Sequence, residues 1–578
     1  MADPSRELAR RFGDALGRAF GADAADANPA LHPSAHADYQ ADVALGLGKR
    51  LRRPPRQVAD ALVAALDVRD LCAAVTIAGP GFVNLTLDDG WMAAQLGRML
   101  ADPRLDVPHG KPADRVIVDY SSPNVAKEMH VGHIRGTVIG DALCRVLAFL
   151  GHDVLRQNHL GDWGTPFGML IEHMLDSSAG AGAGETDISD LNAFYQEARA
   201  KFDADVAFAE RARRRVVALQ GGDPPSRALW QRLCDVSLGH IDSVYARLGV
   251  LLERSDIVPE SFYQPRLAEV IDELGKLGLL EESEGALCAF PDGFTGREGA
   301  RVPLIVRKQD GGYGYATTDL CALRYRTREL RGTRLLYVVG APQAMHLGMV
   351  AAVGRRADWV DAGVRVEHVA FGAVLGPDGK MLKTRSGESV RLTDLLDEAG
   401  ERAAAVLAQK APDMDPTERA AIARAVGVGA VKYADLSTER IKDYMFSWDK
   451  MLAFDGNTAP YLMYAHARIR SILRRADASG SAAAPRLGRP TAPAERALAL
   501  QLLELASILA RTAETAEPHR LAGYLHRLAT AFTGFYESCP VLKADGPERE
   551  HRLALCGLTA AALARGLDLL GIEAPERM

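Results

Sequence analysis

The segment from Arg115 to Gly151 constrains the fold of this 578-residue chain more than any other. It begins with the β-branched run Arg115-Val-Ile-Val-Asp-Tyr-Ser, which is typical of a buried strand. Turn-forming residues follow at 121–124, and apolar residues then recur at helical spacing over 134–151. A strand that enters a helix through a polar loop predicts a parallel α/β sheet. In such a sheet this junction faces the ligand crevice, and the helix N-terminus favours a phosphate.

The polar side chains of this junction suit a nucleotide. His130 and His133 are three residues apart and would share a face of a first helical turn. Gly132 lies between them and has no Cβ, so a flat base or ribose can approach the backbone closely. Lys127 adds a cation three residues before His130. With the helix N-terminus, these groups suit a phosphoryl group that gains negative charge.

Two simpler interpretations of the histidine pair stay open on spacing alone. The pair can be part of a zinc site, or it can be two solvated side chains. A zinc site needs further ligands, and no Cys/His cluster stands near this segment.

The pattern S-P-N-x-A-K-x-x-H-x-G-H at residues 122–133 resembles the His-x-Gly-His signature of class I aminoacyl-tRNA synthetases. In this long form it is similar to the arginyl members of that family, and the resemblance extends over nearly the whole chain. It implies a multidomain α/β protein with a Rossmann-type catalytic domain. The implied reaction attaches L-arginine to its cognate tRNA using ATP, through an arginyl-adenylate, and releases AMP and pyrophosphate. ATP with Mg²⁺ is then the expected cofactor, and no structural zinc is expected.

The composition fits a soluble globular protein of about three or four domains. Hydrophobic residues make up 48% and charged residues 25% of the chain. We expect no membrane span, since no segment offers about 18 uninterrupted apolar residues. The N-terminus lacks the apolar core of a signal peptide.

Cysteine usage and charge point to a cytoplasmic protein. The seven cysteines are scattered, which fits a reducing compartment and gives no metal framework. The net charge of −6 does not indicate a nucleic-acid partner, and binding to one would need a local basic surface. The partners that the resemblance implies are tRNA(Arg), L-arginine and ATP, and we expect a monomer.

Residues 1–105 predict a separate small α/β domain. The spacing of Leu8, Phe12, Leu16 and Phe20 predicts an amphipathic helix. Further helices are expected at 58–66 and 91–100, and strands at 73–78 and 82–87. The resemblance implies a tRNA contact for this domain, whereas a plain packing domain fits the residues equally well.

Residues 106–405 form the predicted catalytic domain, with a helical insertion near 175–260. A second strand starts at Asp153 and ends in a polar loop. In that loop Asn158, Gly161, Asp162 and Gly164 match the family's N-x-x-G-D-x-G. We interpret this loop as part of the site wall, and an ordinary turn at a strand end is the alternative.

Tyr315 and Asp319 are four residues apart and would share a helix face. An acid beside an aromatic ring suits a guanidinium, through bidentate ion pairing and flat stacking. From the residues alone, a carboxylate near a helix N-terminus beside a core tyrosine is the better explanation. The match to the family's Y-x-x-x-D, which holds the arginine side chain, reverses that preference.

The resemblance implies further contacts to both substrates. Four more positions are implied for arginine in addition to His133: Asp119, Ser122, Asn124 and Gln343. His130, Gly132, His133 and His346 are implied for ATP. Strands are expected at 335–340 and 366–375, with a helix that opens at Ala341.

Residues 380–388 predict a flexible basic loop where many class I enzymes carry K-M-S-K-S. Read from Lys380, K-M-L-K-T matches directly, and Lys383 is the lysine that binds the ATP phosphates. Shifted by one residue, Thr384 takes that place, and Lys127 is then the stand-in that the family suggests. The two registers stay open, as does a surface hairpin with no catalytic part.

Residues 406–578 predict an all-helical domain similar to the family's anticodon-binding domain. The segment 455–475 combines aromatic and basic residues, which suit a splayed RNA loop, although the aromatics fit a helical core equally well. Met578 ends the chain where the family has an aromatic RNA contact.

Two rival functions remain. A cysteinyl synthetase would use zinc-bound thiolates, and the sequence offers no suitable Cys/His set. A non-catalytic RNA-binding paralogue is the other rival, and the presence of Lys127, His130 and His133 argues against it.

Overall fold

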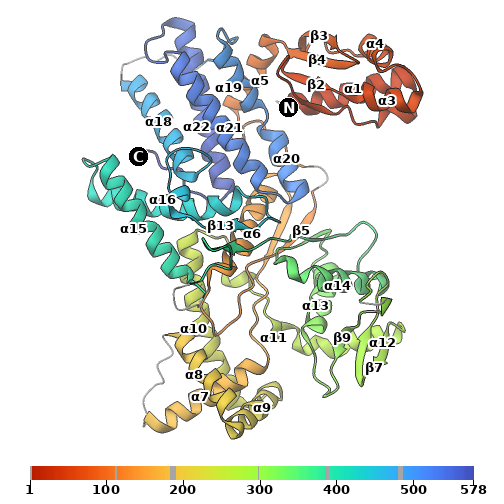
Figure 1. The fold of residues 1–578 in the computed structure, drawn as a ribbon, viewed down its shortest axis with the longest axis vertical. Helices are drawn as coiled ribbons and strands as arrows, with labels where there is room; N and C mark the ends of the chain where they lie inside the picture. The colour runs from red at the N-terminus through yellow and green to blue at the C-terminus, as the bar shows by residue number, and fades with distance from the viewer. Residues whose placement is uncertain (1–2, 111–112, 182–189, 297–298, 384–388, 479–485) are drawn as a thin grey trace.

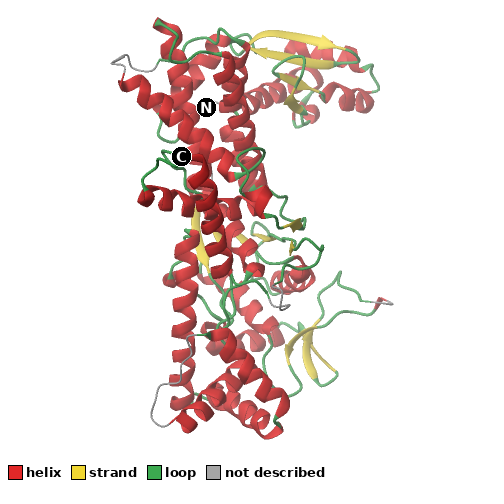
Figure 2. Ribbon diagram, turned by 60° about the vertical axis from the view of Figure 1, so that its left-hand side comes forward, coloured by secondary structure: helices red, strands yellow, loops and turns green. Residues whose placement is uncertain are grey.

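The computed structural model describes residues 3–110, 113–181, 190–296, 299–383, 389–478 and 486–578. The molecule is elongated (Figure 1). The C-terminal helices lie at one end with the N-terminal domain beside them, and the parallel sheet lies near the middle. The helices of residues 165–248 reach the other end. The strands lie in separate groups among the helices (Figure 2).

The N-terminal part is the small α/β domain that the sequence predicts. Its antiparallel sheet has the order β1-β2-β4-β3. The four-residue spacing of Leu8, Phe12 and Leu16 forms the buried face of the first helix. The elements are α1 (Pro4–Phe20), α2 (Ala22–Ala25), β1 (Leu31–Pro33), β2 (Tyr39–Ala41), α3 (Val43–Leu51), α4 (Pro55–Ala65), β3 (Cys72–Ala78), β4 (Phe82–Leu87) and α5 (Asp89–Ala101).

A four-stranded parallel sheet forms the centre of the molecule, as predicted. Its order is β11-β10-β5-β6. The chain passes from β5 through a helix to β6 on one side, while β10 lies on the other. The carboxyl ends of β5 and β10 therefore open the crevice in which such sheets bind ligands. The elements are β5 (Arg115–Asp119), α6 (Val131–Phe149), β6 (Asp153–Gln157), β10 (Arg334–Tyr337), η5 (Ala341–Gln343), α14 (Ala344–Arg356) and β11 (Arg365–His368).

Helix α6 packs unusually close to the end of β5. A Cβ added at Gly140 would lie 2.3 Å from Cβ and Cγ of Tyr120, the residue that follows the strand. At Gly136 an added Cβ would lie 3.2 Å from Cζ of Phe371. Glycine at these two positions lets the helix approach both aromatic rings and so sets the position of its N-terminus.

Two further groups of elements lie between β6 and β10. The first is the predicted helical insertion. The second contains an antiparallel sheet of order β7-β8-β9 and the helix that carries Tyr315 and Asp319. The elements are α7 (Thr165–Ala181), α8 (Leu191–Ala204), α9 (Val206–Gln220), α10 (Pro224–Leu248), η1 (Arg254–Asp256), α11 (Glu260–Tyr263), η2 (Gln264–Arg266), α12 (Leu267–Lys276), β7 (Leu280–Ser283), β8 (Ala286–Ala289), β9 (Leu304–Arg307), α13 (Tyr315–Arg324) and η4 (Tyr325–Glu329).

The prediction of one strand over 366–375 is wrong. Strand β11 ends at His368, and a separate strand β12 (Val374–Leu375) pairs with β13 (Tyr444–Met445) outside the parallel sheet. The chain leaves the sheet at Gly372, where an added Cβ would lie 2.5 Å from Oδ1 of Asp443. That aspartate also accepts the backbone N–H of the next residue at 2.6 Å.

The C-terminal part is helical, as predicted. The proposed boundary at residues 405–406 lies within α15, which packs along α16. Among the described helices, none is both long and apolar enough to cross a membrane. The elements are α15 (Leu392–Lys410), α16 (Pro416–Leu436), α17 (Trp448–Met451), α18 (Ala459–Ala478), α19 (Pro493–Leu503), α20 (Leu505–Thr515), α21 (His519–Ser538) and α22 (Gly546–Leu569).

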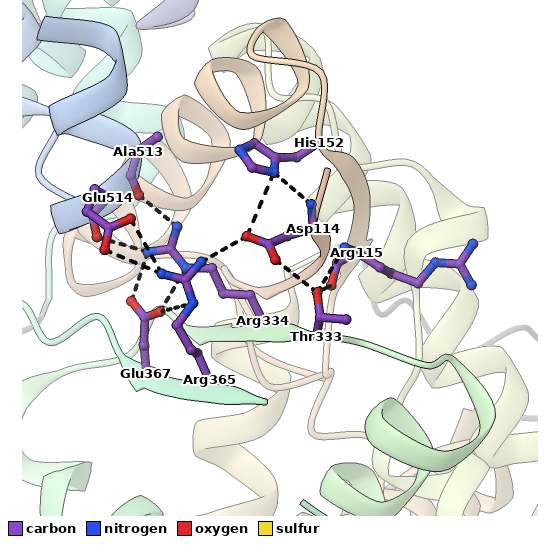
Figure 3. A network of polar contacts seen from close by, with 9 residues as sticks. All are labelled: Asp114, Arg115, His152, Thr333, Arg334, Arg365, Glu367, Ala513 and Glu514. Carbon is purple, nitrogen blue, oxygen red and sulfur yellow. Dashed lines mark hydrogen bonds and ion pairs between the residues drawn. The ribbon is translucent and has the colours of Figure 1, made fainter. Parts of the chain in front are cut away.

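A polar network joins the sheet to the C-terminal helices (Figure 3). Buried Arg334, the first residue of β10, donates to both carboxylate oxygens of Glu367 at 2.8 and 2.9 Å. It also donates to the carbonyls of Ala513 and Glu514 at 2.8 and 3.1 Å, near the end of α20. One side chain thus ties two strands to a helix about 180 residues later in the sequence.

Candidate active site

The loop between β5 and α6 is strained. Three of its non-glycine residues have left-handed backbone angles: Ser121 (φ 70°), Ser122 (φ 45°) and Ala126 (φ 66°). Each such residue costs of order 1–3 kcal/mol, and these conformations cluster at functional sites. Buried Asn158 supports the loop, because its Oδ1 accepts the N–H of Ser122 at 3.0 Å. The hydroxyl of Tyr245 donates to Ser121 Oγ at 2.6 Å.

The histidine pair forms the N-terminal cap of α6. The helix begins at Val131, three residues earlier than predicted, so His130 is the capping residue and His133 lies in the first turn. Nδ1 of His130 accepts the N–H of Gly132, and Nδ1 of His133 accepts the N–H of His130, both at 3.1 Å. The ring centroids lie 4.1 Å apart, so the structure brings the two imidazoles together.

Burial decides the charge of both rings, and the hydrogen bonds to Nδ1 decide which ring nitrogen carries the proton. Burial is the main cause that lowers the pKa of His133, to about 4, and neighbouring His130 and Lys127 lower it further. Burial and then Lys127 also lower the pKa of His130. Both rings are therefore neutral at pH 7, and because each Nδ1 accepts a hydrogen bond, the ring proton is on Nε2. Each ring offers an N–H donor at a helix N-terminus without carrying a charge.

Gly132 has a second role that sequence reasoning missed. A Cβ at this position would lie 2.8 Å from Cε1 of His130. Glycine is therefore required for the His130 ring to fold back onto the helix, in addition to leaving the backbone exposed.

Asp119 and Ser122 lie side by side at the end of β5, but the carboxylate of Asp119 already has partners within the chain. It accepts the Ser122 hydroxyl at 3.1 Å and pairs with Nη1 of Arg326 at 2.8 Å. Buried Arg326 also donates to Gln157 at 2.6 Å. Arg326 lies in the π-helical turn η4 that continues α13, and such turns are frequent at functional sites. No signal in the sequence singled out this arginine.

Tyr315, Asp319 and His346 form a second cluster. Nε2 of His346 lies 2.6 Å from Oδ2 of Asp319, and the Tyr315 and His346 rings lie 4.9 Å apart. Of the residues predicted to bind substrate, Tyr315 and His346 line a cavity of about 1100 Å³. Its wall also includes Trp163 and Gly164 from the loop after β6, in agreement with the interpretation of that loop.

Glu260, the first residue of α11, lines the same cavity and was missed from the sequence. Burial raises the pKa of its carboxyl to about 7, and the charges of Asp162 and Asp319 raise it further. Arg227 and Lys308 also line the cavity, and the Glu260 carboxyl, on which the charge of Asp319 acts, is the acceptor that the cavity offers to a cationic ligand. In the sequence, Pro259-Glu-Ser indicated only the start of a helix.

Three further predicted residues are exposed. Asn124 pairs through its backbone with Gly161, the first glycine of the loop after β6. The ammonium of Lys127 lies 4.4 Å from the ring centroid of Tyr195 on α8. Gln343 is exposed at the end of η5.

The described residues on both sides of the basic loop after β12 pair with each other, and the chain then lies beside the histidine cap. The first part of the loop is paired, since Gly376 N–H donates to the Lys380 carbonyl at 2.7 Å, and exposed Lys383 pairs with Ser389. Directly afterwards Val390 accepts the N–H of Val131 at 2.9 Å. Residues 384–388, including Thr384, lie outside the described residues, so the two registers remain open.

Within the described parts of the chain, the structure gathers no set of three or more His, Cys, Asp or Glu side chains that could hold a metal ion. The seven cysteines are all buried free thiols.

Family models match three successive parts of the chain. Residues 6–87 match "Arginyl tRNA synthetase N terminal domain", residues 95–448 match "tRNA synthetases class I (R), catalytic domain", and residues 462–578 match "DALR anticodon binding domain".

Full-length relatives and solved structures agree with these matches. The arginine–tRNA ligase of Thermobifida fusca is 55% identical over 579 residues, and that of Synechococcus elongatus 49% identical over 587, each with 100% of both chains covered. The arginyl-tRNA synthetase structure from Plasmodium falciparum has a TM-score of 0.86 at 29% identity and covers 99% of each chain. The one from Thermus thermophilus has a TM-score of 0.81 at 26% identity and covers 99% of this chain and 100% of its own. The resemblance drawn from the sequence is confirmed, and the chain belongs to the arginyl-tRNA synthetases, in class I of the aminoacyl-tRNA synthetases.

Proposed function

We propose that this protein attaches L-arginine to tRNA(Arg) in two steps. The carboxylate of arginine attacks the α-phosphorus of ATP, and pyrophosphate leaves. A ribose hydroxyl at the end of the tRNA then attacks the carbonyl of the arginyl-adenylate, and AMP leaves. The family membership and the two clusters at the carboxyl end of the sheet support this reaction.

One observation carries the proposal: Glu260, Tyr315 and His346 line one cavity, with Asp319 held by His346, while the N-terminus of α6 presents two uncharged donors. The first arrangement suits a guanidinium, and the second suits phosphate oxygens. A protein that recognises an arginine side chain and joins the arginine carboxylate to a nucleotide needs both.

Asp319, Tyr315 and Glu260 are proposed to receive the guanidinium. Asn124, Gln343 and Ser122 are proposed to contact the rest of the amino acid. Asp119 would position these residues indirectly, because its pairing with Arg326 and Ser122 holds the loop on which Asn124 lies.

For ATP, we propose that Nε2–H of His130 and of His133 donate to phosphate oxygens. Because both rings are uncharged, each would donate a hydrogen bond to a phosphate oxygen as negative charge builds there, and neither ring would give up its proton. Exposed Gly132 gives the nucleotide access to the helix N-terminus. Lys127 and Lys383 are proposed to supply the positive charge, and Mg²⁺ would arrive bound to the ATP phosphates.

The parts of the chain divide this work. We propose that residues 106–405 catalyse the reaction and that residues 1–105 and 406–578 bind the tRNA, the latter with Met578 at its contact surface. We further propose that the protein acts as a monomer in the cytoplasm, which agrees with its free thiols.

ATP–pyrophosphate exchange tests the proposal. The exchange is measured with each of the twenty amino acids, with and without tRNA(Arg). Exchange that depends on arginine alone supports the function. Exchange with cysteine would identify the other class I rival. RNA binding without exchange for any amino acid would identify a non-catalytic paralogue.

A further inference from the structure

The exposed side chain of Lys127 ends on an aromatic ring of the helical insertion. Its ammonium lies 4.4 Å from the ring centroid of Tyr195 on α8. A cation over the face of an aromatic ring is attracted by the negative potential of that face. Burial lowers the pKa of His130 and of His133, and the charge of Lys127 lowers both further, so the ammonium lies within electrostatic reach of the two imidazoles. The contact with Tyr195 therefore holds this charge close to the histidine cap.

The same helix also holds the backbone beside Lys127. The N–H of Glu128 donates to Oδ1 of Asn192, and Nδ2 of Asn192 donates to the Glu128 carboxylate, both at 3.3 Å. Asn192 and Tyr195 are three residues apart on α8, so they share a face of the helix. That face fixes the Lys127 side chain at both ends, through the backbone next to its Cα and through the ammonium at its tip.

An aromatic ring suits this task better than a carboxylate. A carboxylate would pair with the lysine and cancel the charge that a phosphate needs, whereas a ring brings no opposite charge and leaves N–H donors of the ammonium free. The adjacent carboxylate, that of Glu128, has other donors: Arg391 lies 3.0 Å from it, and Asn192 donates to it. The charge of Lys127 thus stays available to an anionic ligand.

We propose that Tyr195 is a positioning residue for arginine activation, because it holds the Lys127 ammonium beside the histidine cap, where the phosphates of ATP would bind. In this role Tyr195 acts through Lys127 and not through a contact of its own with ATP or arginine. The helical insertion then takes part in the reaction through the face of α8 that carries Asn192 and Tyr195. This role rests on the function proposed above, in which Lys127 supplies positive charge to ATP.

The effect of losing the ring follows from the flexibility of lysine. An ammonium that nothing holds moves through the rotamers of a four-carbon side chain, and each ATP must then order it at a cost in entropy. The catalytic efficiency with ATP should therefore fall. The arginine pocket should keep its affinity, because neither Lys127 nor Tyr195 is proposed to meet the amino acid.

The test measures ATP–pyrophosphate exchange by the full-length protein with tRNA(Arg) present, and it yields kcat/KM for ATP and KM for arginine. Tyr195→Leu keeps an apolar side chain without an aromatic face, and Tyr195→Phe keeps the ring. Lys127→Met, alone and combined with Tyr195→Leu, completes a double-mutant cycle. The control is Phe202→Leu, about two turns further along α8. The Phe202 ring lies under the guanidinium groups of Arg199 and Arg213, at 5.7 and 5.6 Å from its centroid.

Tyr195→Leu is expected to lower kcat/KM for ATP about fivefold or more, the size of one cation–π contact. KM for arginine should stay within about twofold of its original value, the scatter expected between independent sites. Tyr195→Phe and Phe202→Leu should behave like the unmodified protein. In the Lys127→Met background the leucine substitution should have no further effect, because the ring then has no ammonium to hold.

A histidine-selective ¹⁵N NMR titration reports the position of the ammonium without relying on turnover. In Tyr195→Leu the pKa of His130 should rise, because a nearby positive charge no longer opposes protonation of the ring. Phe202→Leu should leave this pKa unchanged. The titration decides the question even where Lys127→Met is too slow to assay.

Several results would overturn the proposed role of Tyr195. An equal loss from Tyr195→Leu with and without Lys127, or a matching loss in Phe202→Leu, would mean that α8 acts only on folding. A higher kcat/KM in Tyr195→Leu would mean that the ring keeps the ammonium away from ATP. An unchanged kcat/KM, or an unchanged pKa of His130, would mean that the ring does not position the lysine.

Failure of this role and failure of the proposed function look different. If Lys127→Met exchanges normally with arginine, the role of Tyr195 fails while the function stands. If the unmodified protein shows no exchange that depends on arginine, the function itself fails.

Discussion

At the scale of single residues, the carboxylate of Asp319 is expected to decide arginine affinity. Asp319→Asn keeps the shape of the side chain but removes the charge that meets the guanidinium. Arginine affinity should fall by at least about 30-fold, since truncating one partner of a buried charged pair costs about 2–5 kcal/mol. Calorimetry measures this loss. The matched control is Asp272→Asn on the exposed face of α12, and it should bind arginine normally. Near-normal arginine affinity in Asp319→Asn would contradict the assigned pocket.

A second residue-scale prediction concerns the pH dependence of stability at His133. Its folded pKa is lowered, by burial first, to about 4, whereas a free imidazole has a pKa of about 6.5. Between these pH values the unfolded chain binds more protons than the folded one. The free energy of unfolding should therefore fall as the pH drops from about 6.5 to 4.

His133→Asn isolates this effect, because the Asn side chain keeps an oxygen acceptor for the backbone N–H of His130 but does not titrate. Urea unfolding at pH 7 and pH 5 should show a smaller loss of stability for the variant than for the unmodified protein. In the unmodified protein, ¹⁵N NMR should report Nδ1 unprotonated and Nε2 protonated at pH 6. Parallel losses of stability in both proteins would mean that His133 titrates normally.

At the scale of secondary-structure elements, the close packing of α6 on the end of β5 is expected to be intolerant of any side chain at Gly140. Gly140→Ala places a methyl group 2.3 Å from two atoms of Tyr120, so the helix or the ring must move. Overpacking of this kind costs about 1–3 kcal/mol. Gly239→Ala in the helix α10 is the control, because an added Cβ there meets nothing within 4 Å. There, alanine should stabilise by up to about 1 kcal/mol. The two melting temperatures should therefore move in opposite directions, and a stable Gly140→Ala would mean that α6 can shift freely.

The same elements show how far the sequence alone reaches. The strand before Tyr120 and the helix after it follow from local composition and period, so they were predicted to within a few residues. The cap was not, because the pattern marks Ser121–Asn124 as turn residues, while the structure uses His130. Helix capping by an imidazole depends on Gly132, which only the packed structure reveals.

Contacts between residues far apart in the sequence could not be predicted. The sequence suggested Tyr315 and Asp319 through a family pattern, yet nothing in it indicated that His346 or Glu260 would join them. These residues come from three different helices, and their meeting depends on how α11, α13 and α14 pack. The break between β11 and β12 was also missed, because the β-branched run continues while a contact with distant Asp443 turns the chain away.

At the scale of the whole molecule, Arg334 is expected to make the sheet and the C-terminal helices unfold together. Its guanidinium meets Glu367 on β11 and two carbonyls of α20 (Figure 3). Arg334→Met keeps the length of the side chain but leaves the carboxylate and both carbonyls without this donor. Loss of hydrogen bonds to charged and buried groups should cost about 2–3 kcal/mol.

The expected sign of this loss is a change in the shape of the thermal transition as well as in its midpoint. A multidomain chain unfolds in one step only while its parts stabilise one another. With the tie removed, differential scanning calorimetry should resolve a second, lower transition. Arg115→Met is the control from the same network: Arg115 pairs with Asp153 at 2.6 Å, but both side chains are about half exposed, at 45% and 51%. An exposed pair contributes at most about 1 kcal/mol, so this variant should keep the original single transition. If both variants melt alike, the buried contact of Arg334 does not hold the two parts together, and their cooperativity comes from other contacts between them, such as the ion pair of buried Arg135 on α6 with Asp435 on α16.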